Sequence, residues 1–87
     1  MSFVLTDNHL SLASKAGRTH AEAEHSLGVN INSALEYDPL TLEEDKRALV
    51  FAVTGQKLDV DSDDAIELIE SYEDGYFGYW EEVEDNG

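Results

Sequence analysis

The chain of 87 residues contains no cysteine, which excludes disulfide bonds, thiolate metal sites and cysteine nucleophiles. Imidazole chemistry is limited to three histidines, His9, His20 and His25. His20 and His25 are five residues apart, whereas a spacing of four places two metal ligands on one helix face. No serine–histidine–aspartate arrangement and no glycine-rich phosphate loop is recognisable. We therefore expect neither an enzyme nor a bound cofactor or metal.

Long apolar runs are also missing. No segment approaches the roughly 18 apolar residues that span a bilayer. Residues 1–7 lack a basic stretch followed by an apolar run, so we expect no signal peptide. Because anionic lipid surfaces repel a strongly acidic protein, we also expect no membrane contact and a cytoplasmic location.

Positively charged residues are scarce, with five Lys and Arg against twenty Asp and Glu, for a net charge of −15. The imbalance is uneven: residues 57–87 hold twelve of the acids and a single base, Lys57, while residues 1–35 hold three acids and two bases. This charge excludes nucleic acid as a direct partner, unless a small basic patch around Lys15 and Arg18 is used. Since concentrated like charge destabilises a fold, we expect a binding function to account for it.

The apolar residues that are present recur with helical spacing. Eight aromatic side chains argue against disorder despite the charge. We predict a mainly α fold, a compact bundle of about four short helices forming a single domain over residues 1–87. A short strand pair, giving an α+β fold, is the alternative.

Two short helices are predicted in the first third. Residues 8–16 follow Thr6 or Asp7 as N-cap, and Gly17 ends that helix. A second helix covers residues 19–27.

The second helix has its own signals. Thr19 and Glu22 form a capping box, and Gly28 follows the last turn. Residues 29–32 then alternate apolar and polar, which favours a short strand or an extended link, and residues 33–37 add a helical turn.

The third helix has the strongest start signal. Pro39 breaks what precedes it, Thr41 and Glu44 form a capping box, and Gly55 ends the helix. The continuous apolar run 48–53 predicts a helix buried on most sides, around which the others pack.

The fourth helix is amphipathic. It is expected to begin near Ser62 and to reach Asp74, before Gly75 and Gly78 interrupt it. Its apolar stripe is Ala65, Ile66, Ile69 and Tyr72, broadened by Leu68. Residues 81–87 are either one more exposed turn or a disordered acidic tail.

Acidic residues on this helix form a row. Asp63, Glu67, Glu70 and Asp74 recur three or four residues apart, an interval of about 5–6 Å that is close to the spacing of phosphates along a nucleic-acid strand. A solvated outer face or a halophilic source would also produce acidic residues. The nearly neutral first third argues against both and favours mimicry of phosphates.

Residues 59–70 also resemble an EF-hand calcium loop. Asp59, Asp61, Asp63 and Glu70 would be its ligands. Asp64 stands at the sixth position, where the sharp turn needs glycine. We prefer Asp61 or Ser62 as an N-cap, with acids favoured in the first helical turn.

The segment from Tyr72 onwards resembles ArdA-type antirestriction proteins, which present a surface that imitates DNA. The matching residues are Tyr72, Glu73, Tyr76, Gly78, Glu81 and Glu82. In size and charge the chain is also similar to small acidic phage proteins that disable host defences, including anti-CRISPR proteins. These resemblances imply the mimic mechanism.

The sequence therefore predicts an inhibitor that occupies the nucleic-acid groove of a host defence nuclease complex (CRISPR effector or restriction enzyme), in the host cytoplasm if the protein is phage-encoded. An EF-hand-like calcium module, or an acidic regulatory partner of a host DNA-binding protein, is the alternative. Aromatic side chains near the acids are either core residues or interface anchors. The predicted partner-binding residues are Asp59, Asp61, Asp63, Asp64, Glu67, Glu70, Glu73, Asp74, Tyr76, Tyr79, Trp80, Glu81, Glu82, Glu84 and Asp85.

Overall fold

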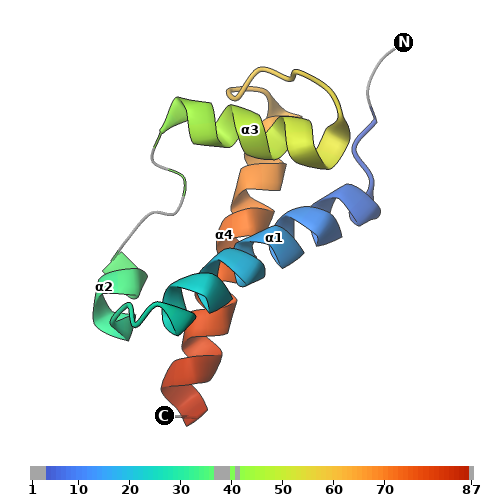
Figure 1. The fold of residues 1–87 in the computed structure, drawn as a ribbon. Helices are drawn as coiled ribbons and strands as arrows, with labels where there is room; N and C mark the ends of the chain where they lie inside the picture. Colours follow the sequence, from blue (N-terminus) through green and yellow to red (C-terminus); the bar gives the residue numbers. More distant parts are fainter. Residues whose placement is uncertain (1–3, 37–39, 41, 87) are drawn as a thin grey trace.

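The computed structural model describes residues 4–36, 40 and 42–86, and this part of the chain is all-helical (Figure 1). Its elements are α1 (Asp7–Ser26), α2 (Ile31–Glu36), α3 (Glu43–Thr54) and α4 (Asp63–Asn86). The predicted mainly α fold is confirmed. The strand alternative is wrong for the described residues, because residues 29–30 are a short link and residues 31–32 already belong to α2. No described helix has both the length and the apolar character needed to cross a membrane.

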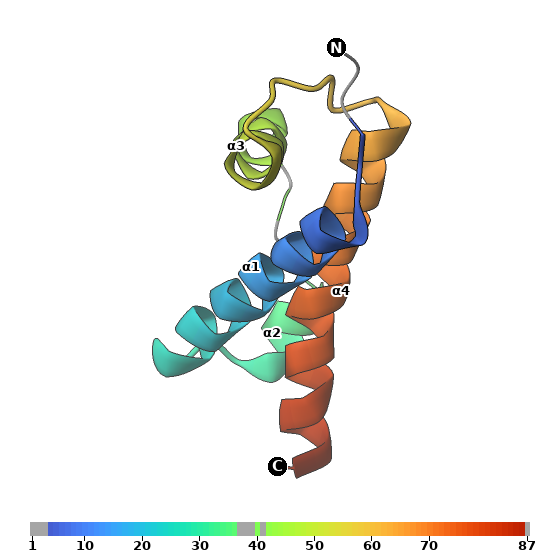
Figure 2. The same cartoon turned by 90° about the vertical axis from the view of Figure 1, so that its right-hand side faces the viewer.

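Two long helices, α1 and α4, cross at the centre of the molecule, with α3 across one end and α2 towards the other (Figures 1 and 2). Both helices carry a glycine at the crossing. A Cβ atom on Gly17 would overlap the backbone carbonyl of Tyr72, and one on Gly75 would overlap the carbonyl of Ser14. The two backbones therefore touch, which only residues without a Cβ allow.

The continuity of α1 and α4 overturns three predictions. Gly17 does not end a helix but lies buried inside α1, and neither Gly75 nor Gly78 interrupts α4. Thr19 caps nothing, since its hydroxyl donates to the carbonyl of Lys15 one turn earlier, at 2.9 Å. Glycine is a weak helix former, but close helix packing outweighs that cost here.

The ends of α1 follow the local signals. Thr6 is the N-cap, and its side chain accepts from the backbone N–H of His9. The His9 ring in turn accepts from the Thr6 N–H at 3.1 Å, which completes a capping box. At the other end, Gly28 has a φ of 88°, a conformation that favours glycine and turns the chain away.

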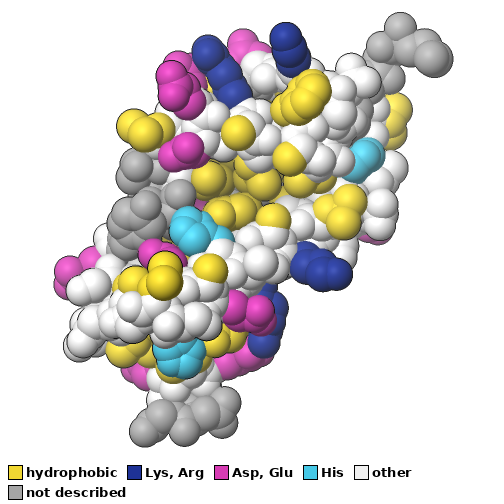
Figure 3. Space-filling model, viewed as in Figure 1, with side chains coloured by type: hydrophobic (Ala, Val, Ile, Leu, Met, Phe, Trp, Pro, Cys, Tyr) yellow, Lys and Arg dark blue, Asp and Glu magenta, His cyan; other side chains and the backbone are white. Residues whose placement is uncertain are grey.

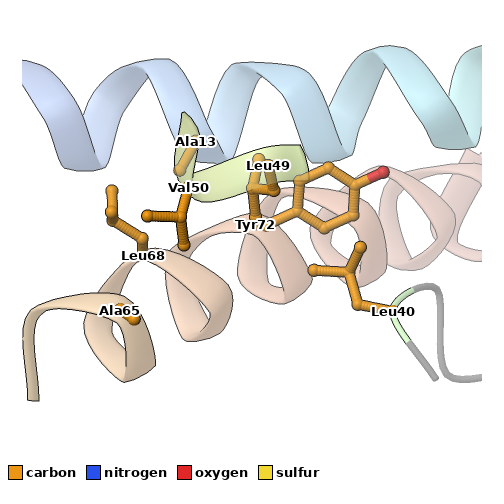
Figure 4. Close-up of a cluster of buried hydrophobic side chains, with 7 residues drawn as sticks. All are labelled: Ala13, Leu40, Leu49, Val50, Ala65, Leu68 and Tyr72. Atoms are coloured by element: carbon orange, nitrogen blue, oxygen red, sulfur yellow. The ribbon is translucent and has the colours of Figure 1, made fainter. Parts of the chain in front are cut away.

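The core has two parts, both built on α4. The first lies between α1, α3 and α4 (Figure 4) and consists of Ala13, Leu40, Leu49, Val50, Ala65, Leu68 and Tyr72. The second joins α1, α2 and α4 and consists of Ala21, Ala34, Tyr76 and Trp80. Since α4 supplies side chains to both, it and α1 form the central packing unit.

The prediction that α3 is central and buried on most sides is wrong. Leu49 and Val50 are buried, but Ala48, Phe51 and Ala52 are exposed. The N-cap of α3 is Leu42, which makes no side-chain cap bond, while the predicted cap residue and the preceding proline lie outside the described residues. Gly55 ends the helix, as predicted, and it adopts the left-handed conformation there.

The last helix is longer than predicted. It continues through the glycines to Asn86, so residues 81–86 are helical rather than an irregular tail. Ile66, predicted on the buried stripe, is 41% exposed, while Leu68 lies fully buried near its centre. The continuous 3.6-residue period carries the buried stripe on from Tyr72 to Tyr76 and Trp80.

Candidate functional site

The start of α4 is fixed by a cap and a turn. The Ser62 hydroxyl oxygen accepts from the Ala65 N–H at 3.3 Å, and the Ser62 hydroxyl donates to the Asp59 carbonyl at 2.6 Å. The Asp59 carboxylate accepts from the Asp61 N–H at 2.9 Å. The N-cap interpretation of this segment is therefore confirmed for Ser62.

The calcium alternative finds no matching geometry. In the described ranges, no three carboxylate or imidazole side chains come close enough to hold a metal ion. Its four proposed ligands, Asp59, Asp61, Asp63 and Glu70, are all exposed and are not gathered around one point. A continuous helix from Asp63 separates Asp63 from Glu70 by nearly two turns.

The acidic row predicted for α4 extends along the whole helix. At about 100° per residue, six carboxylates fall within one narrow sector opposite the buried stripe. We call this set the acidic row: Asp63, Glu67, Glu70, Asp74, Glu81 and Asp85. All six are exposed. From first to last the row spans about 33 Å at 1.5 Å per residue.

The remaining predicted acids flank the row. Asp64 and Glu82 lie along one side of it, Glu73 and Glu84 along the other, and Asp59 and Asp61 extend it into the preceding turn. In total, ten of the 24 residues of α4 are Asp or Glu and none is Lys or Arg. A helix of this length is about 36 Å long, which gives one carboxylate per about 3.6 Å. One strand of duplex DNA carries one phosphate per about 3.4 Å.

The ion pairs found among the described residues do not use the acidic row. Arg18 pairs with Glu82 at 2.8 Å and with Glu22 at 3.5 Å, and its guanidinium lies 5.3 Å from the centre of the Tyr79 ring. The hydrogen bond and charge of Arg18 lower the pKa of Glu82. Arg18 therefore compensates the charge of Glu82, one of the predicted partner-binding acids.

Two of the three predicted aromatic anchors are core residues. Tyr76 is fully buried and Trp80 is 1% exposed, both in the second cluster. Tyr79 is half-buried, and its hydroxyl lies 2.8 Å from Nδ1 of His25. The sequence prediction did not place these rings in the core, because it ended the helix at Gly75. In a continuous helix, Tyr76 and Trp80 continue the buried stripe that contains Tyr72.

A polar network between α1 and α4 was missed. The Tyr72 hydroxyl lies 2.6 Å from Nδ1 of His20, and Nε2 of His20 lies 3.7 Å from the Glu24 carboxylate. Tyr76 donates its hydroxyl to the same carboxylate. The four-residue spacing of His20 and Glu24 indicates that the two side chains lie on one helix face. Their partners on α4, Tyr72 and Tyr76, are 52 residues away, and no local pattern predicts these contacts.

Comparison with known proteins identifies no relative: no protein-family model, no curated protein and no solved structure matches the chain. The resemblance to ArdA-type and anti-CRISPR proteins therefore rests on its short pattern, size and charge alone. What supports a function is the geometry and charge of α4.

Proposed function

We propose that the protein is a phosphate-mimicking inhibitor that binds the basic nucleic-acid groove of a host defence nuclease complex, a CRISPR effector or a restriction enzyme, and blocks its access to DNA. The observation that carries the proposal is the acidic row, six exposed carboxylates along one straight helix with flanking acids that bring the charge density close to that of a DNA strand. The protein acts by binding, without catalysis.

The placement of these acids opposes the stability of the helix that carries them. Glu81, Glu84 and Asp85 lie near the C-terminal end of α4, where the helix dipole is negative and cations are favoured. No basic residue stands in the last turn. Like-charged pairs three or four residues apart add a cost of a few tenths of a kcal/mol each. A binding partner rich in Lys and Arg would offset both terms.

The mechanism follows from the groove that such a partner presents. Lysine and arginine side chains that hold successive phosphates would instead meet carboxylates at similar intervals along α4. Arginine can donate two parallel hydrogen bonds to a carboxylate in the same geometry that it uses for phosphate. The concentrated charge would speed encounter with the basic groove, and once bound the helix would exclude the nucleic acid.

The test is capture of partners from host lysate by the immobilised protein at low and high salt, with and without competing DNA. Captured proteins should be released by DNA and by salt, because both act on the same charge pairs. Their identity separates a defence nuclease from a DNA-binding regulator, the alternative partner class. Binding that resists both salt and DNA would contradict the proposal.

Charge-reversal variants test the surface itself. Glu67→Lys with Glu70→Lys reverses the middle of the acidic row and should abolish capture. The matched control is Glu36→Lys with Asp45→Lys, which makes the same change in net charge at exposed residues outside α4. The control should retain most of the binding. Equal loss in both variants would mean that net charge, and not the row, is recognised.

A further inference from the structure

The outward face of α3 is apolar and uncovered. Ala48, Phe51 and Ala52 recur at the three- and four-residue spacing of one helix face, and all three are exposed, Phe51 at 51%. Figure 3 shows hydrophobic side chains gathered over α3 and in the hollow between α3 and α1. Apolar residues on one side of a helix are normally packed against another element, but these three are left exposed by the described part of the chain.

A groove adjoins this face. It is lined by Glu44, Arg47, Ala48, Phe51, Lys57 and Leu58, between α3 and the segment that follows it. One patch therefore combines a protruding aromatic ring, Phe51, with apolar walls that can receive one. This combination suits an interface with two-fold symmetry, in which the same patch serves both subunits and must be complementary to itself.

The charges around the patch favour a second copy of the chain over other occupants. Residues 43–58 hold three acids, Glu43, Glu44 and Asp45, and three of the five bases of the whole chain, Lys46, Arg47 and Lys57. This segment is therefore neutral within a protein of net charge −15. Arg47 already pairs with Glu43 of the same helix at 3.3 Å. The groove also holds Glu44 and Lys57, so a copy related by a half-turn can set Lys57 against Glu44 at two symmetric places.

The position of the patch also suits association. α3 lies at the end of the molecule away from the C-terminus, along a principal extent of 47 Å (Figures 1 and 2). Two copies joined at α3 keep the acidic C-terminal parts of α4 far apart, beyond the Debye length of about 10 Å at 0.1 M salt. Repulsion between these C-terminal acids, Glu81, Glu84 and Asp85, is thus largely screened.

We propose that the protein forms a two-fold dimer through the exposed face of α3, with Phe51 of each subunit inserted into the groove of the other. The interface is one helix face and a short adjoining segment, so the dimer belongs to the small, weak class and assembles at micromolar or higher concentration. This inference is independent of the proposed function. It adds that the inhibitor presents two acidic rows, pointing away from a shared centre.

Sedimentation of the full chain, from micromolar to millimolar concentration and at 0.1 M and 1 M salt, tests the dimer. The dimer should strengthen with salt, because the interface is apolar and neutral while the remaining charge repels. Capture of a basic partner has the opposite salt dependence, so the two proposals can fail separately. A monomer under all of these conditions would overturn the dimer.

Three variants test the face. Phe51→Glu should weaken association by at least about tenfold, since it places a charge where the dimer would bury an aromatic ring. Ala48→Arg should weaken it as well, although this variant lowers the net negative charge and so reduces repulsion. Leu27→Glu is the control, an 84% exposed leucine at the end of α1 that lies outside the patch.

The control should dimerise like the unmodified chain once its extra charge is screened at 1 M salt. Helix content from circular dichroism should be unchanged in all three variants, because each replaced side chain is exposed. A dimer that survives both Phe51→Glu and Ala48→Arg, or one that Leu27→Glu removes equally at high salt, would refute an interface on α3.

Discussion

Single atoms decide how α1 and α4 meet. The missing Cβ atoms of Gly17 and Gly75 let each helix touch the backbone of the other, whereas a Cβ on Gly78 would meet no atom within 4 Å. Gly75 and Gly78 lie in the same helix, α4, but their substitution is expected to have opposite effects on stability. Substitution by alanine separates the two roles.

Gly75→Ala should lower the free energy of unfolding by about 2–3 kcal/mol, because the helices must move apart to admit the methyl group. Gly78→Ala should raise it by about 0.5–1 kcal/mol through the better helix propensity of alanine. Urea unfolding followed by circular dichroism measures both. Similar effects of the two substitutions would mean that the crossing is not as close as the structure shows.

The ion pair between Arg18 and Glu82 makes the stability of the fold depend on pH. Because Arg18 lowers the pKa of Glu82, the pair stabilises the fold above the ordinary carboxyl range near pH 4.3 and loses that contribution as the pH falls through the lowered pKa. Glu82→Gln should therefore be less stable than the unmodified chain at neutral pH and equally stable in strong acid. Urea midpoints at both pH values check this, and a constant difference would contradict the pairing.

At the scale of elements, the charge of α4 conflicts with its own dipole. Asp85→Lys replaces an acid with a base in the last turn, where a cation is favoured by about 0.3–1 kcal/mol. The variant should have a higher melting temperature and, if the acidic row is the binding surface, weaker capture of its partner. Asp85→Asn is the control and should give a smaller gain of the same sign. A lower melting temperature for the lysine variant would show that the charges of α4 do not oppose its folding.

At the scale of the whole molecule, the net charge of −15 acts against the compact state. Raising the salt concentration from 0.1 M to 1 M shortens the Debye length from about 10 Å to about 3 Å, so the free energy of unfolding should rise. Glu67→Gln with Glu70→Gln should reduce this gain, because it removes two members of the acidic row. Urea titrations at both salt concentrations measure the change. If salt raises the free energy of unfolding of the variant by as much as that of the unmodified chain, the rise comes from general salting-out and not from screening of the acidic row.

The sequence by itself determined the features that depend on neighbours along the chain. The helical class, the caps at Thr6 and Ser62 and the acidic row follow from spacings of three or four residues, and the end of α3 at Gly55 follows from the residue type alone. Such patterns are local, since a cap or a helix face is completed within one or two turns. The charge asymmetry needs no structure at all.

Only the tertiary structure decided what the glycines and aromatic residues do. Glycine is typical of a helix end, which is why Gly17 and Gly75 were predicted to stop their helices. Both lie inside a helix, because the backbone of the other helix packs directly against each of them. That contact carries α4 through to Asn86, buries Tyr76 and Trp80, and leaves α3 half uncovered. Contacts between residues more than 50 positions apart determine these features. A local sequence pattern does not specify which distant helix will pack against a given residue.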